Sequence, residues 1–188
     1  MNDTILWYAT RGAGVVSLLL LTAVVCLGVV TSIKWQNRAV PLFLSVNLHR
    51  NVSLLAIVFL ALHIVTAVVD PYTHLGVIAA LLPFASYYRT FWLGLGVVAF
   101  DLFVALILTS VFRSRVGQRT WRAVHWLAYA MWPIAILHGI GTGSDPSAAW
   151  MLVVNVVCFA LVVAAVAWRV SDPLSPSAVT SPSPRSLS

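Results

Sequence analysis

The sequence predicts an all-α integral membrane protein, a bundle of five transmembrane helices. Of its 188 residues, 61% are hydrophobic and only 9% are charged, whereas a soluble domain carries roughly 25% charged residues. The chain contains five long apolar stretches, and most of its Lys and Arg residues lie in the short gaps between them. Because so few charges cannot cover the surface of a soluble domain, a cytosolic enzyme and a disordered chain are both excluded.

Each apolar stretch is long enough to cross a hydrocarbon core, which takes about 20 residues. Within lipid the backbone N–H and C=O groups must form their hydrogen bonds inside the segment, so each span is predicted to be a helix. The first is not predicted to be a signal peptide, because its apolar run from Gly12 to Val30 exceeds a typical h-region and no small-residue cleavage site follows it. The predicted spans are residues 12–33, 46–69, 91–112, 121–140 and 148–168.

The cations are divided unequally between the two sides of the membrane. Eight lie on one side and two on the other, which predicts a multi-pass protein of the cell membrane with its N-terminus outside and its C-terminus in the cytoplasm. Because they occupy short gaps and form no continuous face, a nucleic-acid partner is not predicted. The eight are Lys34, Arg38, Arg50, Arg113, Arg115, Arg119, Arg122 and Arg169, and the two are Arg11 and Arg89.

Residues 1–170 are predicted to form one helical domain in the lipid bilayer. Within it, residues 70–90 are the one long external loop, whose apolar run from Gly76 to Phe84 is too short to span and favours an interfacial or re-entrant cap. Residues 171–188 hold seven Ser and four Pro, a composition that predicts a disordered cytoplasmic tail. The two cysteines lie inside apolar runs, so neither a disulfide framework nor a CxxC metal site is expected.

Four of the five histidines lie in the second and fourth predicted spans. His49 and His63 are fourteen residues apart, and His125 and His138 are thirteen apart. Both spans run from inside to outside, so the histidines form two pairs at two depths, roughly 20 Å apart at 1.5 Å rise per residue. A neutral imidazole is a good ligand for haem iron. This pattern predicts two stacked haems, each clamped between the two helices by His49 with His125 or by His63 with His138.

The histidines have two other interpretations. A single histidine in a helix is more often a hydrogen-bonded packing residue, and four in matched pairs favour ligation. Zinc is less favoured because it takes four ligands that converge on one point.

The spacing of thirteen residues between His125 and His138 falls about 140° short of four helical turns. Pro133 removes a backbone hydrogen bond between His125 and His138, so a local distortion there could restore the phase.

The cations and the aromatic residues close to the histidines each have a functional and a structural interpretation. Arg50 and Arg122, beside His49 and His125, could neutralise haem propionates or could only mark the positive-inside topology. Arg89, with Tyr87 and Tyr88, could serve the outer haem in the same way. The aromatic residues between the two haem depths could carry electrons or could only pack. They are Trp126, Trp132 and Phe59.

Two further polar residues, Asp101 and His74, are candidates for a functional role. Asp101 lies near the middle of the third span, where a charge costs about 3 kcal/mol. It could be a proton relay or orient a haem ligand, or it could be protonated and hydrogen-bonded to a neighbouring helix. His74 lies in the external loop and could meet a metal substrate or a partner, although an ordinary exposed histidine is the better interpretation.

Four short motifs surround these histidines: LHR at 48–50, ALH at 61–63, WRAVHWLAY at 121–129 and LHGIGTGSD at 137–145. With them the sequence resembles the ferric reductase-like transmembrane domain family, which is related to the membrane halves of NADPH oxidases and ferric reductases. The resemblance extends over residues 5–170. It implies that the family's axial haem ligands, spaced fourteen and thirteen, fall on the four histidines, and that both cofactors are haem b.

The chain departs from the oxidases at its C-terminus. A Ser/Pro tail stands where they continue into a flavin- and nicotinamide-binding domain, and no GxGxxG follows a strand. The expected function is therefore a di-haem b-type cytochrome that passes electrons across the membrane, the haem subunit of a ferric reductase-like oxidoreductase. Any flavin would belong to a partner, a soluble or membrane-associated flavoprotein reductase. The alternatives are a haem subunit that feeds a periplasmic reductase and a non-catalytic haem-binding subunit; a homo-oligomer stays open.

Overall fold

The computed structural model describes residues 2–33, 42–71, 75–143 and 148–171, and all regular structure in these ranges is helical. The prediction of five spans is confirmed, because five helical segments are long and apolar enough to cross a membrane. The fourth of these segments combines α6 and α7. The helices are α1 (Asn2–Ser32), α2 (Leu42–Val69), α3 (Val77–Leu81), α4 (Thr90–Val111), α5 (Arg113–Val116), α6 (Gln118–His125), α7 (Ala128–Thr142) and α8 (Ala149–Ser171).

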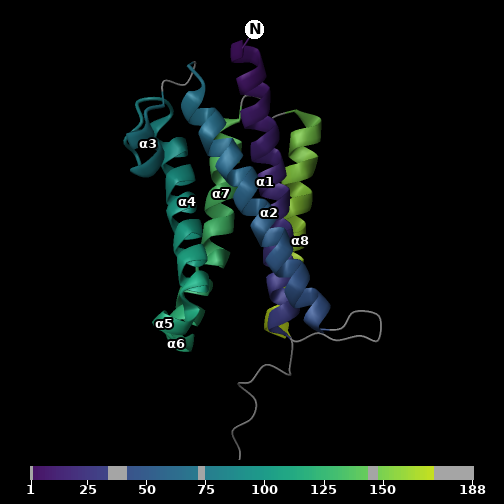
Figure 1. Ribbon diagram of the computed structural model, residues 1–188. Coiled ribbons are helices and arrows are strands. Elements are labelled where there is room, and N and C mark those ends of the chain that lie inside the picture. The colour runs from purple at the N-terminus through teal and green to yellow at the C-terminus, as the bar shows by residue number, and fades with distance from the viewer. Residues whose placement is uncertain (1, 34–41, 72–74, 144–147, 172–188) are drawn as a thin grey trace, which may run out of the picture.

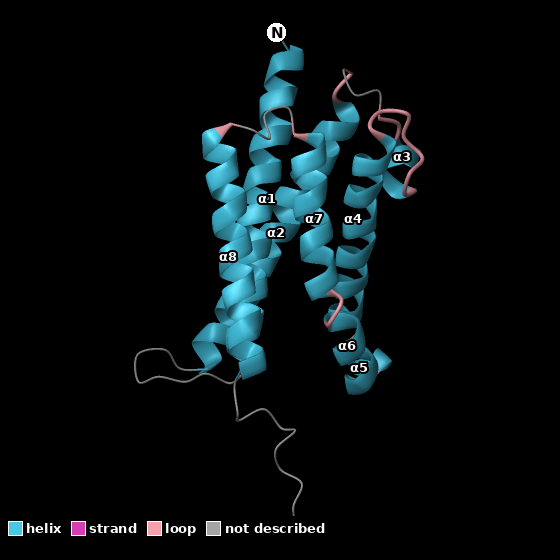
Figure 2. Cartoon of the chain, turned by 180° about the vertical axis from the view of Figure 1, so that it is seen from behind, coloured by secondary structure: helices cyan, strands magenta, loops and turns pink. Residues whose placement is uncertain are grey.

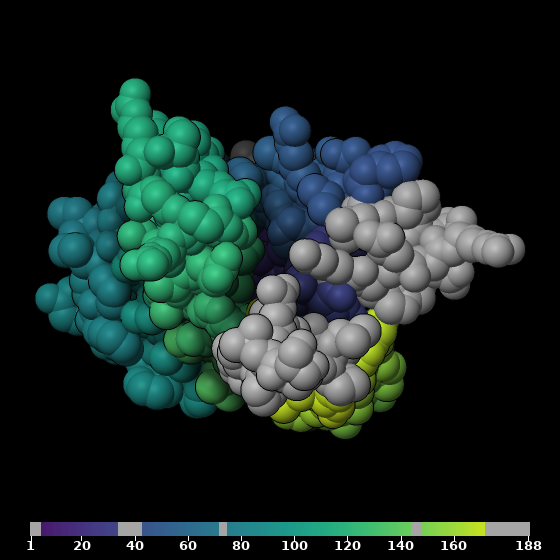
Figure 3. Space-filling view, turned by 90° about the horizontal axis from the view of Figure 1, so that it is seen from below, coloured from purple at the N-terminus to yellow at the C-terminus, as the bar shows by residue number. Residues whose placement is uncertain are grey.

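The spanning helices form two groups that meet along α1 (Figure 1). Helix α1 packs against α2, α8 and α7, while α4 packs against α7 and α6. Among the described helices, α2 and α7 are not a closely packed pair. Seen from the α6 end, the molecule is hollowed between α6 and α2, with α1 behind the hollow (Figure 3). The two histidine-bearing segments therefore face each other across a space.

The core is one apolar cluster to which all five spanning segments contribute. Leu21, Phe103 and Trp132 are buried in it, together with Ala56 of α2 and Cys158 of α8. Large apolar side chains are exposed along the outer faces of α2 and α8. Such faces suit a hydrocarbon surrounding, in which exposed apolar surface carries no penalty.

Helix α1 begins ten residues earlier than its predicted span, at Asn2 instead of residue 12. The added turns project beyond the rest of the bundle (Figure 1). Hydropathy locates only the part of a helix that lies in hydrocarbon, and a helix can continue into the polar region beyond it. The aromatic rings of Trp7 and Tyr8, which pack 4.7 Å apart, lie on this projecting part.

The fourth span is not one helix, as the sequence had predicted, but two. Trp126 and Leu127 interrupt it between α6 and α7, and the pink turn in Figure 2 marks the break. Here the backbone forms i→i−3 hydrogen bonds, among them Leu127 N–H to the Val124 carbonyl at 2.9 Å and Tyr129 N–H to the Trp126 carbonyl at 3.1 Å. Such bonds tighten the turn and change the phase of the residues that follow. The expected distortion is therefore present, but it precedes Pro133, which lies inside α7.

The apolar run in the external loop forms the short helix α3, which lies beside the start of α4 (Figure 1). The segment after it takes left-handed conformations at Phe84 and Arg89. Arg89 also donates a hydrogen bond of 2.6 Å from Nη1 to the carbonyl of Gly141, which joins this segment to the end of α7. At the opposite end of α4, the turn before α6 needs a positive φ of 79° at Gly117, a conformation that glycine adopts without strain.

Several predictions from the sequence lie outside the described residues. They concern the cations Lys34 and Arg38, the loop residue His74, and the tail from residue 172 onward. The division of residues 1–170 and 171–188 into a domain and a tail stays a prediction.

A buried hydrogen bond between α7 and α1 generates a first test. Trp132 donates from Nε1 to Thr22 Oγ1 at 3.0 Å, and Thr22 donates in turn to the Leu18 carbonyl. We expect Trp132→Phe to lower the free energy of unfolding by about 1 kcal/mol, because interhelical hydrogen bonds in membranes have this magnitude. Titration of the micelle-solubilised protein with SDS measures the change. The control is Trp150→Phe at an exposed ring; equal losses in the two variants would contradict the assignment.

Candidate functional site

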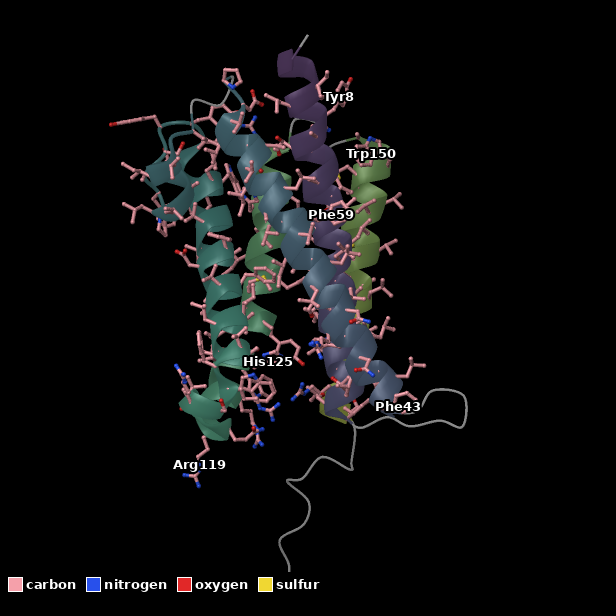
Figure 4. All side chains as sticks on the ribbon, in the orientation of Figure 1. Tyr8, Phe43, Phe59, Arg119, His125 and Trp150 are labelled. Atoms are coloured by element: carbon pink, nitrogen blue, oxygen red, sulfur yellow. The ribbon has the colours of Figure 1, made fainter. Side chains whose placement is uncertain are left out.

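The structure brings the four histidines of the spans together in the two expected pairs. The ring centroids of His49 and His125 are 6.4 Å apart, and those of His63 and His138 are 6.3 Å apart. In both pairs the ring planes are strongly crossed, at 66° and 75°. His125 lies near the end of the bundle that carries Phe43 and Arg119 (Figure 4). The two pairs therefore occupy two depths between α2 and the α6–α7 segment.

Three of these histidines are oriented by a backbone carbonyl of a neighbouring helix. A carbonyl oxygen can only accept, so the Nδ1 atom in each contact carries the proton and the opposite ring nitrogen, Nε2, keeps its lone pair. Metal-bound histidines in proteins are fixed in this way by their second nitrogen. The contacts join His49 to the Val24 carbonyl at 3.1 Å, His63 to the Thr10 carbonyl at 2.9 Å and His138 to the Trp92 carbonyl at 2.9 Å.

A glycine stands beside each of these three histidines. A Cβ atom on Gly96 would lie 2.5 Å from the ring of His138, and one on Gly14 would lie 3.0 Å from the ring of His63. Beside His49 the space is less tight, with 3.5 Å from a Cβ on Gly28. The rings therefore lie against the bare backbone of α1 and α4, where a larger residue would displace two of them.

The geometry of each pair fits a metal that brings most of its own ligands. A metal midway between two imidazoles, bonded to each at about 2 Å, would separate the ring centroids by roughly 6 Å. Each pair alone supplies only two ligands. Among the described residues, no three His, Cys, Asp or Glu side chains gather into a metal-binding group. An iron porphyrin supplies four ring nitrogens and leaves two axial positions for imidazole, so this donor set suits haem.

A cavity of about 830 Å³ adjoins the His63–His138 pair. It extends toward the end of the bundle where Tyr8 and Trp150 lie (Figure 4), and Arg11 and Arg89 line it. Three buried oxygens without a hydrogen-bond partner among the described residues belong to residues that line the same cavity. They are Thr10 Oγ1, Ser17 Oγ and Asn155 Oδ1. Unpaired polar atoms in an apolar bundle are costly, so they fit an occupant with polar groups of its own.

The cations predicted near the haems are placed unequally. Arg89 lines this cavity, as does Arg11, for which the sequence predicts only a role in topology. Arg50 and Arg122 are exposed at the other end of the bundle, and neither lines this cavity. The structure thus brings cations to the His63–His138 pair from α1 and from the residue that precedes α4.

The remaining candidates lie away from the cavity. Asp101 is exposed on α4 and forms no hydrogen bond with the described residues, so it is seen neither to orient a haem ligand nor to bond a neighbouring helix. Trp132 is buried in the core, while Trp126 is exposed and packs under the guanidinium of Arg169 at 4.4 Å. Phe59 lies midway along α2 (Figure 4). The contacts of the two tryptophans are those of packing residues.

Reasoning from the sequence missed the residues that support the histidines. Gly14 and Gly28 are fourteen residues apart, the same spacing as His49 and His63 on the antiparallel partner helix. That repeat was the one available signal. The carbonyl acceptors left no signal, because every residue has a carbonyl group.

Five spanning helices with facing imidazole pairs between them define a multi-pass membrane protein suited to redox chemistry. Residues 13–136 match the model of the family described as the ferric reductase like transmembrane component, and the chain belongs to that family. It is thus a membrane redox subunit of a family whose domains generally bind haem. The match includes three of the four histidines and ends two residues before His138. Comparisons with curated proteins and with solved structures found no match.

The contact between Gly96 and His138 generates a second test. We expect Gly96→Ala to lower the haem bound per chain, because its Cβ would push the ring away from the Trp92 carbonyl. The matched control is Gly12→Ala on α1, which meets nothing within 4 Å, does not line the cavity and gains helix propensity. A pyridine haemochrome assay of the purified variants measures both. Equal haem content in the two variants would show that this close approach is unimportant for binding.

Proposed function

We propose that the chain is a di-haem b-type cytochrome that passes electrons across the cell membrane, as the haem subunit of a ferric reductase-like oxidoreductase. The observation that supports it most is the pair of facing imidazole sites, each spaced for one axially ligated metal. His49 with His125 would hold one haem, and His63 with His138 the other. Three of these ligands are already held in the tautomer that ligation requires.

Haem b supplies a one-electron Fe(III)/Fe(II) couple, and the protein's residues determine how that couple is used. If the two imidazoles of each pair bound one iron, they would leave no coordination position for oxygen, which favours electron transfer over oxygen activation. His49 and His63 are fourteen residues apart on α2, or about 21 Å along the helix axis. The two sites thus divide the thickness of a bilayer of about 30 Å into shorter steps.

The cations complete the proposed haem sites. Arg11 and Arg89 line the cavity beside His63 and His138 and would neutralise the propionates of that haem. Arg50 and Arg122 would do the same beside His49 and His125. The cations at the α6 end favour the cytoplasm for that end, which makes the His49–His125 site the inner one. A flavoprotein reductase at the inner face would then supply electrons, and an acceptor would take them at the outer face.

Substitution of the ligands tests the pairing. The parent protein should hold two low-spin, six-coordinate haems per chain. We expect His63→Ala and His138→Ala to lose the same haem and His49→Ala and His125→Ala the other, because each haem is held by its own pair. Haem analysis and redox-difference spectra of the purified variants measure this. A stoichiometry of one in folded parent protein, or loss of the same haem from His49→Ala and His138→Ala, would refute the proposal.

Thiol accessibility tests the orientation. In a chain whose Cys26 and Cys158 are replaced by Ala, we expect Tyr87→Cys to react with a membrane-impermeant maleimide on intact cells, because Tyr87 is fully exposed in the predicted external loop. Arg119→Cys should react only after lysis. Detergent-solubilised samples, in which both react, provide the control for reactivity. The reverse pattern on intact cells would invert the proposed direction of the two sites.

A further inference from the structure

Three of the four candidate ligands share one local arrangement, which we call the carbonyl–glycine cradle. In each, the histidine Nδ1 bonds to the carbonyl of residue n on the neighbouring helix, and its ring lies against a glycine at n+4. The carbonyl orients the ring, and the glycine provides room for it. The cradles are Thr10 and Gly14 for His63, Val24 and Gly28 for His49, and Trp92 and Gly96 for His138.

The fourth candidate ligand, His125, has no such cradle. Its Nδ1 atom is buried and has no hydrogen-bond partner among the described residues. Because His125 and His138 are thirteen residues apart, the counterpart of Gly96 for His125 would lie thirteen residues further along α4. That position holds Thr109 instead of glycine. The Thr109 hydroxyl donates to the Ala105 carbonyl at 2.7 Å, so the acceptor four residues earlier is already engaged by a side chain.

His125 is instead held by an aromatic contact. Trp121, one turn earlier on α6, stacks on its ring with centroids 4.9 Å apart and planes 25° apart. Trp121 is itself fixed on two sides. Its Nε1 donates to Ser110 Oγ at 3.3 Å, and the guanidinium of Arg113 lies 4.1 Å from its ring centroid. The indole is therefore clamped between the ends of α4 and α5 and presents a fixed face to the imidazole.

We infer that Trp121 is the positioning residue of His125 and takes the place of the missing cradle. The two haem sites therefore differ in how their ligands are oriented. This inference rests on the proposed function. A carbonyl fixes the rotation and the tautomer of an imidazole, whereas a stacked ring fixes only its plane. The His63–His138 site has two ligands held by hydrogen bonds, and the His49–His125 site has one. The inner haem is therefore the one whose retention and spectrum depend on an aromatic neighbour.

Substitution of Trp121 in the full chain tests the inference, with the outer haem as internal standard. We expect Trp121→Ala to release the inner haem to excess apomyoglobin roughly ten-fold more readily, the low end of the effect of removing a partner that orients a ligand. The ferric EPR signal of the inner haem should also shift, since it depends on the angle between the imidazole planes. Trp121→Phe keeps a stacking ring and should restore both properties. His49→Ala assigns the inner signal.

The matched control is Trp126→Ala, which removes an aromatic ring from the same span but contacts Arg169 and Tyr129 instead of a candidate ligand. It should leave both haem signals unchanged. Two parent-like signals in Trp121→Ala, or equal changes in both haems, would overturn the inference. If Trp121→Ala does not fold, Trp121→Leu decides, because it fills the same space without a stacking ring: a shift of the inner signal alone supports the inference and an unchanged spectrum overturns it. Parent protein without two low-spin haems would instead refute the proposed function.

Discussion

Hydrocarbon offers no water to a polar group, and the structure depends on how this chain meets that constraint at its histidines. An unbonded ring N–H within a bilayer would cost several kcal/mol, and three of the four histidines bond to an acceptor inside the bundle. Thr10 and Trp92 provide it through carbonyls that already serve their own helices, since a carbonyl oxygen has two lone pairs. The same bond that satisfies the N–H directs the other nitrogen into the space between the helices. A single hydrogen bond thus both satisfies the ring N–H and orients the ligand.

This coupling explains the arrangement of the helices. For a histidine of α2 to reach a carbonyl of α1, the two helices must approach closely, and Gly14 permits that approach. Helices α4 and α7 repeat the solution at Gly96. Each ligand-bearing helix is therefore packed tightly against a supporting helix on one side, and the space for a cofactor remains on the other. One group of helices, with α1 and α2, supplies one histidine of each pair, and the other group, with α4, α6 and α7, supplies the second.

Much of this architecture is readable from the sequence, and the reasons differ from feature to feature. Hydropathy predicts the spans because lipid demands apolar length, and the histidines are visible because they are rare in such spans. A distortion between His125 and His138 was expected around Pro133, but the position of the break, at Trp126 and Leu127, was not predicted. It depends on which hydrogen bonds the chain forms after packing, and no glycine or proline marks it. The extension of α1 to Asn2 was missed because hydropathy has no signal for a helix outside lipid.

The carbonyl acceptors also determine how this site tolerates genetic change. A side chain can be altered by one codon, but the backbone oxygen of Val24 or Trp92 persists through almost any substitution there. Drift at these positions can therefore alter the lipid contacts and leave the orienting bond in place. Vulnerability is concentrated instead in the small residues, since at Gly96 even one added methyl group reaches the imidazole. A family built on this plan can diverge widely in its apolar side chains and still keep its ligands aligned.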